Sequence, residues 1–222
     1  MAIIMVGTIK GGVGKTTTSQ SICVKLAQGG VSTVLIDLDE TKSAMKWSSD
    51  RQSHGHEPSI TVIQNLINPV QTVLDMAKKF DVVVIDVGAR DVGSIATFAR
   101  ICDLWVIPAG VGQKELDATV DLFVQFESQH QFHKDGRIPM ACFFSCVPTR
   151  NTSELQDARE FLEECVPNIP LLKSITRDRK AFTDADKLGL SVIEMKGRDS
   201  IKAVKETEQL IAELFSKMKA GE

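Results

Sequence analysis

Short, nearly uninterrupted hydrophobic runs alternate along this chain with longer segments in which apolar residues recur at helical spacing. Runs of the first kind are typical of parallel strands buried on both faces, and the second spacing is typical of helices that cover them. The pattern predicts strands over Ile3–Val6, Thr33–Asp37, Ile60–Ile63, Val82–Asp86, Leu104–Pro108 and Met140–Cys146, with Leu171–Leu172 as a candidate short last strand. It predicts helices over Lys15–Gln28, Thr41–Asp50, Val70–Lys79, Gly93–Arg100, Leu116–Gln129, Ser153–Cys165, Arg179–Leu188 and Ser200–Met218.

This alternation determines the fold class that we expect. Parallel strands need long connections, and a helix between successive strands supplies one each time. We therefore predict an α/β fold with a mostly parallel, twisted sheet and helices on both faces. No repeat, low-complexity tract or linker interrupts residues 1–222, so we expect a single domain over the whole chain.

The composition excludes some classes of protein. The 222 residues are 43% hydrophobic and 25% charged, as in ordinary soluble globular proteins. No apolar run reaches the roughly 18 residues that a spanning helix needs, and no signal peptide is recognisable, so we expect a cytoplasmic protein without a membrane partner. The net charge of −3 excludes a globally basic nucleic-acid binder but is compatible with a local basic face.

The cysteines agree with that compartment. Their odd number and irregular spacing argue against a disulfide framework. We expect buried thiols among apolar neighbours, with Cys142 and Cys146 as an alternative pair of metal ligands. The five positions are Cys23, Cys102, Cys142, Cys146 and Cys165.

The most informative segment is the glycine-rich run GTIKGGVGKTTT, which follows the first predicted strand and opens the first predicted helix. A helix N-terminus concentrates free N–H groups, and glycines let the preceding loop turn its amides toward phosphates. Lys15 is placed to reach the β- and γ-phosphates, Thr16 to bind Mg²⁺ and Thr17 to touch the α-phosphate. The predicted nucleotide-binding residues are Lys10, Gly11, Gly12, Val13, Gly14, Lys15, Thr16 and Thr17.

Carboxylates close two of the predicted strands. Asp37 and Asp39 follow the second strand, and Asp86 ends the fourth. The carboxyl ends of parallel strands form the edge where ligands bind in such sheets. We expect Asp86 to hold Mg²⁺ through water, with a helix cap or loop residue as the alternative.

The run K-G-G-V-G-K-T-T, which begins at Lys10, resembles the deviant Walker A motif of the ParA/MinD family, with Ile9 where the usual motif has its first glycine. In that family the early lysine reaches across a dimer interface to the partner's nucleotide. The resemblance implies that Lys10 makes ATP hydrolysis depend on dimerisation, since a second cation stabilises charge on the transferring phosphoryl group. A solvated loop lysine is the alternative.

The resemblance continues into the carboxylates. Residues 37–41 read D-L-D-E-T and are similar to the family's switch I motif, D-x-D-P-Q, although Glu-Thr replaces Pro-Gln. By resemblance, Asp39 positions the attacking water and Asp37 supports the Mg²⁺ shell. Residues 87–90, V-G-A-R, are similar to the small plasmid-type members. The resemblance thus implies catalytic roles for Lys10, Lys15 and Asp39, and metal-binding roles for Thr16, Asp37 and Asp86.

The C-terminal half extends the resemblance to DNA. The segment Ile175–Met195 is similar to a family stretch whose basic residues help to hold non-specific DNA, which requires only positive charge on one face. The candidates are Lys173, Arg177, Arg179, Lys180 and Lys187. A solvated charged helix is the alternative, because aspartates are interleaved. Many relatives read adenine with an asparagine where this chain has Cys146 and the residues after it, so adenine specificity here rests on resemblance alone.

The resemblance as a whole implies a ParA-like ATPase with ATP and Mg²⁺ as cofactors. It implies an ATP-dependent homodimer that coats non-specific DNA at the nucleoid, with slow hydrolysis stimulated by a ParB-like partner, and a low-copy plasmid or another cargo. The last predicted helix carries an apolar stripe that either closes the core or, as in a MinD-like protein, binds a membrane. An iron–sulfur reductase and a small-molecule kinase or ligase are further alternatives of the same P-loop class.

Overall fold

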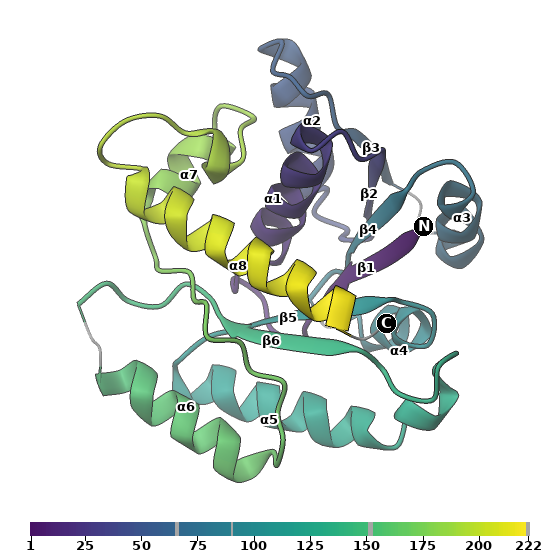
Figure 1. The fold of residues 1–222 in the computed structure, drawn as a ribbon, viewed down its shortest axis with the longest axis vertical. Helices are drawn as coiled ribbons and strands as arrows, with labels where there is room; N and C mark the ends of the chain where they lie inside the picture. Colours follow the sequence, from purple (N-terminus) through teal and green to yellow (C-terminus); the bar gives the residue numbers. More distant parts are fainter. Residues whose placement is uncertain (65–66, 90, 151–152, 221–222) are drawn as a thin grey trace.

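The strands form one parallel sheet, and the strand that leads into the glycine-rich loop lies inside it. The computed structural model describes residues 1–64, 67–89, 91–150 and 153–220. Within these ranges the sheet has six strands in the order β3-β2-β4-β1-β5-β6, all paired in parallel (Figure 1). They are β1 (Ala2–Val6), β2 (Thr33–Asp37), β3 (Thr61–Gln64), β4 (Val82–Asp86), β5 (Leu104–Ala109) and β6 (Met140–Phe144).

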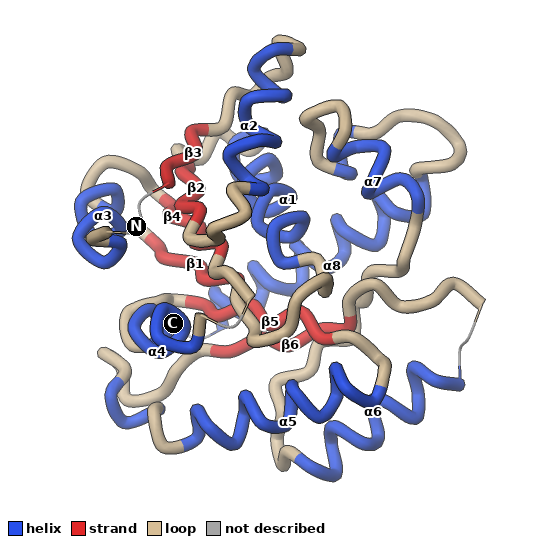
Figure 2. The backbone as a smooth tube through the Cα atoms, turned by 180° about the vertical axis from the view of Figure 1, so that it is seen from behind, coloured by secondary structure: helices blue, strands red, loops and turns tan. Residues whose placement is uncertain are grey.

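Helices cover both faces of the sheet, as expected. The helices α3, α4, α5 and α6 pack on one face, and α1, α2 and α8 pack on the other (Figure 1 and Figure 2). The helix α7 and a short 3-10 helix at Val192–Glu194 pack against the beginning of α8. The bounds are α1 (Lys15–Gln28), α2 (Ser43–Ser53), α3 (Pro69–Ala77), α4 (Val92–Ala99), α5 (Gln113–Glu127), α6 (Ser153–Cys165), α7 (Lys180–Asp186) and α8 (Ile201–Ala220), with a second 3-10 helix at His130–Phe132.

Strand β1 shows why these hydrophobic runs form buried strands. Its side chains alternate between the two cores: Ile3 and Met5 join the α3–α6 side, and Ile4 and Val6 join the α1 side. Each aliphatic side chain buried in this way contributes roughly 1.5–3 kcal/mol. This packing fixes the register of the strands and brings Val6, Asp86 and Asp37 side by side at the carboxyl edge.

The hydrophobic pattern overestimates the length of the sixth strand. The strand β6 ends at Phe144, two residues before the predicted Cys146. Cys146 has a φ of 55°, in the left-handed region, and this turn directs the chain away from the sheet. The predicted strand at Leu171–Leu172 is reduced to one parallel bridge between Leu171 and Cys142.

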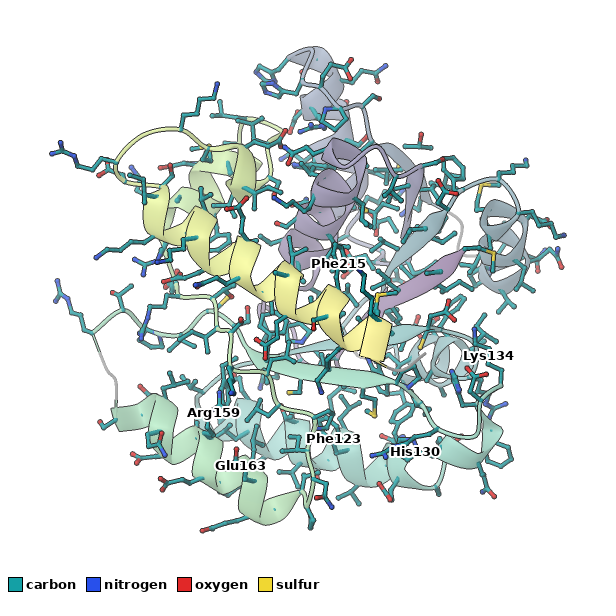
Figure 3. All side chains as sticks on the ribbon, viewed as in Figure 1. Phe123, His130, Lys134, Arg159, Glu163 and Phe215 are labelled. Atoms are coloured by element: carbon teal, nitrogen blue, oxygen red, sulfur yellow. The ribbon has the colours of Figure 1, made fainter. Side chains whose placement is uncertain are left out.

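The last helix closes the core on the α1 side. Leu210, Ile211 and Leu214 are buried there, and Phe215, labelled in Figure 3, packs against the same cluster. The apolar side chains in the second half of α8 are therefore covered by the chain's own strands and helices, whereas Ile201 at its start is 59% exposed. Among the described residues, no helix combines the length and the hydropathy that a membrane span requires.

Candidate nucleotide-binding site

The glycine-rich loop runs from the end of β1 into the first turn of α1. Gly12 and Gly14 each have a φ of 77°, which side chains other than glycine rarely adopt. A β-carbon at Gly14 would also lie 3.0 Å from the Ser145 Oγ. No described side chain caps α1, and its first turn contains no acidic residue, so its N–H groups suit an anion.

Lys15 lies under this loop. It is 7% exposed, and its Nζ donates a hydrogen bond of 2.9 Å to the carbonyl oxygen of Lys10. Burial lowers the pKa of Lys15, while the carboxylates of Asp86 and Asp39 act in the opposite direction. The ammonium group is thus held inside the loop, close to the carboxyl edge of the sheet.

Asp86 lies at the end of β4 and is 1% exposed. Its Oδ1 accepts a hydrogen bond of 3.3 Å from the Ser19 hydroxyl, whereas Oδ2 is buried without a hydrogen-bond partner among the described residues. Burial raises the pKa of Asp86 to about 7; a hydrogen bond from the Thr16 hydroxyl counteracts this rise, and the Asp37 charge adds to it.

This arrangement fits a Mg²⁺ ion. A buried oxygen without a partner costs about 1–3 kcal/mol, and a cation would satisfy it. Carboxylate and hydroxyl oxygens are the ligands that Mg²⁺ prefers, and Asp86 and Thr16 supply one of each beside the loop. These two residues would hold the ion, which neutralises phosphate charge when it is bound.

Both carboxylate oxygens of Asp37 accept hydrogen bonds from backbone N–H groups that follow it in the chain. Its Oδ1 accepts the N–H of Asp39 at 3.0 Å, and its Oδ2 accepts the N–H groups of Ala44 at 3.1 Å and Met45 at 3.2 Å. Burial raises the pKa of Asp37, and these N–H groups lower it. Asp37 therefore fixes the start of α2, and its place in a Mg²⁺ shell stays a prediction.

Asp39 is half-buried at the edge of the same site. Its Oδ1 accepts the N–H of Thr41 at 2.9 Å. The segment after β4 passes close by, since a β-carbon at Gly88 would lie 3.3 Å from the Asp39 Cα. Of the V-G-A-R segment, Arg90 lies outside the described residues.

These elements surround one cavity of about 540 Å³, a volume in the range of small-molecule sites. The loop forms one wall, Asp39 and Thr41 form another, and α8 and residues 176–183 close the far side. Sequence reasoning missed this far side, because no motif links α8 to the loop. The lining includes Gly11, Gly12, Gly14, Lys15, Thr16, Thr17, Ser145, Cys146, Thr176, Arg177, Arg179, Phe182, Thr207, Leu210 and Ile211.

Two cysteines differ from the expectation of burial. Cys146 and Cys165 are exposed, and Cys146 lines the cavity with its Sγ 3.9 Å from the Gly12 carbonyl oxygen. The turn after β6 places Cys146 there. No cluster of three or more His, Cys, Asp or Glu side chains suited to a metal is found in the described ranges.

The predicted DNA-binding residues do not form one cluster. Arg177 lines the cavity and donates to the Pro148 carbonyl oxygen at 2.8 Å, and Arg179 makes two hydrogen bonds of 2.9 and 2.6 Å to Glu206. Lys173, Lys180 and Lys187 are exposed. Four further basic residues next to α7 are exposed and belong to no recognisable motif, namely Lys196, Arg198, Lys202 and Lys205.

A phosphate loop at the edge of a parallel sheet, with a buried carboxylate beside it, defines a nucleotide-binding protein of the P-loop class. The chain belongs to the VirC1 protein family, whose profile matches residues 1–218. The predicted membership in the wider ParA-type group is thereby confirmed.

Individual relatives are distant but similar in length. "Maintenance of carboxysome distribution protein A" of Gloeobacter kilaueensis is 26% identical over 92% of this chain and 90% of the relative. "Protein ParA" of Rhizobium radiobacter is 24% identical over 98% of each chain. The structure titled "pNOB8 ParA bound to nonspecific DNA" superposes with a TM-score of 0.74 and 17% identity, over 100% of this chain and 99% of that one. This superposition shows a shared fold.

Proposed function

We propose that this chain is an ATPase that binds Mg²⁺-ATP in the cavity beside the glycine-rich loop and hydrolyses it slowly. The observation that carries this proposal is the Asp86 Oδ2 atom, which is buried at the end of β4, beside the glycine-rich loop, and has no hydrogen-bond partner among the described residues. The loop amides and Lys15 bind the β- and γ-phosphates, Thr16 and Asp86 hold the ion, and Asp39 orients the water that attacks.

The proposed active form is an ATP-dependent homodimer. Lys10 does not line its own cavity among the described residues; its Nζ lies 3.4 Å from Glu115 instead. A lysine in the phosphate loop that turns away from its own site is available to the nucleotide of a second copy. The second cation would stabilise charge on the transferring phosphoryl group, so that hydrolysis requires the dimer.

The dimer is proposed to bind DNA without sequence preference through a basic lobe, defined by the exposed residues Lys180, Lys187, Lys196, Arg198, Lys202 and Lys205. Ala181 and Ala185 of α7 pack against Val192 and Ala203, so these charges belong to one packed unit. Phosphate contacts need positive charge on one face, and a dimer doubles that face. The DNA-bound relative of the same fold supports this assignment.

The proposed biological role is the positioning of cargo along DNA in the cytoplasm. The relatives named "Protein ParA" and "Maintenance of carboxysome distribution protein A" support a role in positioning, with a low-copy plasmid or another cargo. A ParB-like adaptor would stimulate hydrolysis and release the dimer from DNA. The MinD-like membrane alternative requires a free apolar stripe on α8, and the second half of that stripe packs on the core.

Isothermal titration calorimetry with ATP, with and without Mg²⁺, tests the central step. In the wild type we expect Mg²⁺ to strengthen ATP binding. In Asp86→Asn we expect the affinity for ATP to be the same with and without Mg²⁺. Equal binding with and without Mg²⁺ in the wild type would refute the assignment of this cavity. Sedimentation with plasmid DNA or with anionic liposomes, each with ATP, then separates the DNA-bound alternative from the membrane-bound one.

A further inference from the structure

The side chain of Lys10 is held by a residue that the nucleotide site does not use. Lys10 Nζ lies 3.4 Å from Glu115 Oε1, and the two side chains are 34% and 32% exposed. The main chain of Lys10 is held separately, because Lys15 Nζ donates to its carbonyl oxygen at 2.9 Å. The loop and its early lysine are therefore fixed from two sides.

The Glu115 side chain lies against two glycines, Gly110 and Gly112, which leave room for it because they have no side chain. It lies in the first turn of α5, and its N–H donates to the Gly112 carbonyl oxygen at 2.9 Å. A β-carbon at Gly110 would lie 2.6 Å from Glu115 Cγ, and one at Gly112 would lie 2.5 Å from its Oε2. A side chain at Gly110 would therefore collide with the base of the Glu115 side chain, and one at Gly112 would push its carboxylate aside.

We infer that Glu115 is a positioning residue for Lys10. In a single chain it keeps the ammonium outside the chain's own cavity, and Lys10 leaves Glu115 when it engages the phosphates of a second copy. This inference rests on the proposed ATP-dependent dimer. A partly exposed ion pair is weak, so each pair that is already released is expected to favour dimerisation by up to about fivefold. A dimer contains two such lysines, and the midpoint concentration for dimerisation is therefore expected to fall by up to about 25-fold.

Two variants release Lys10 by different routes. Glu115→Gln removes the charge and keeps the shape, whereas Gly110→Ala keeps the charge and displaces the side chain. Asp121→Asn is the control, because it removes one exposed negative charge from the same helix. The variants are compared after ¹³C-methylation of the lysines, with the Lys10 signal assigned by its absence in Lys10→Arg.

In nucleotide-free protein, both variants should move the Lys10 methyl signal toward that of a solvated lysine, and the control should leave it in place. A Lys10 signal that neither variant moves would overturn the ion pair. With ATP, both variants should dimerise at lower concentration and show faster unstimulated turnover. Unchanged or weaker dimerisation in variants whose signal has moved would overturn the positioning role. A wild type that never dimerises would instead refute the proposed function, while the methyl signal would still decide the ion pair.

Discussion

At the scale of single residues, Asp86 determines what the site can hold. The folded protein keeps this carboxyl at a pKa of about 7, well above the ordinary 3.8, chiefly because it is buried. Between these two values the folded state holds a proton that the unfolded chain has released. The stability of the nucleotide-free protein should therefore fall as pH rises through this window, by up to about 4 kcal/mol from this group.

Asp86→Asn should remove that part of the pH dependence. We expect the nucleotide-free variant to unfold at a higher temperature than the wild type at pH 8 and to gain no stability from Mg²⁺-ATP beyond that from ATP alone. Thermal unfolding across the pH range, with Asp121→Asn as a control of equal charge change, measures both effects. Parallel pH profiles for Asp86→Asn and the wild type would contradict the account of this residue.

Lys15→Ala should abolish nucleotide binding. The substitution removes the buried cation that we propose binds the β- and γ-phosphates, and it leaves the glycine-rich loop without that charge. Fluorescence titration with a labelled ATP analogue should show at least about a hundredfold loss of affinity, as expected for a charged hydrogen bond that is lost together with its ion pairing. Undiminished affinity would show that the loop does not bind the phosphates.

At the scale of elements, α2 is joined to the segment after α7 by a buried ion pair. Arg51 is 1% exposed, and its Nη1 and Nη2 each donate to Glu194 at 2.8 Å. Nearby, Trp47 Nε1 donates to the Leu190 carbonyl oxygen at 3.1 Å. Asp37 holds the start of α2, and Arg51 joins its last turns to Glu194. This helix therefore connects the carboxyl edge of the sheet with the segment that packs against the basic lobe.

Arg51→Met should destabilise the fold by about 3–5 kcal/mol, because it leaves the Glu194 carboxylate buried without its partner. The double variant Arg51→Met with Glu194→Met should recover much of that loss, since it removes the unpaired charge as well. Urea unfolding of the two single variants and the double variant forms a thermodynamic cycle. Additive losses would show that the pair contributes nothing beyond its separate side chains.

The same region shows where sequence reasoning ends. The hydrophobic runs predicted the strands closely because β1, β2, β4, β5 and β6 are almost entirely buried, whereas the edge strand β3 is only partly buried. The motif located the glycine-rich loop between β1 and α1. Gly189 and Glu194 lie in the segment Ile175–Met195, for which the sequence offered a family resemblance and no contact partner. Gly189 is required because its φ is 68° and a β-carbon there would lie 2.2 Å from the backbone nitrogen of Arg51. Such a contact joins residues far apart in sequence, so local patterning does not reveal it. The pairing of Arg179 with Glu206 escaped prediction for the same reason. The left-handed turn at Cys146 escaped prediction because the hydrophobic run continues to this residue.

At the scale of the whole molecule, the basic lobe and the nucleotide cavity share α7 and α8, so ATP binding and DNA binding are expected to be linked. Lys187→Glu with Lys202→Glu should weaken retention on DNA and reduce the salt slope by about one for each phosphate that is no longer neutralised. Lys78→Glu with Lys79→Glu, on two exposed lysines just beyond α3, is the matched control because it makes the same change in net charge. Binding to labelled duplexes at several salt concentrations measures the slopes, and an equal effect in variant and control would argue against the lobe.

The central claim is that ATP converts this chain from monomer to dimer and that hydrolysis reverses the change. Asp39→Ala tests it most directly, because the variant keeps the glycine-rich loop and the proposed Mg²⁺ ligands but loses the carboxylate that we propose orients the attacking water. Light scattering after size exclusion should show about twice the chain mass of 24.3 kDa with Mg²⁺-ATP and the single-chain mass with Mg²⁺-ADP. A single-chain mass in both nucleotides, from a variant shown by calorimetry to bind ATP, would contradict the account.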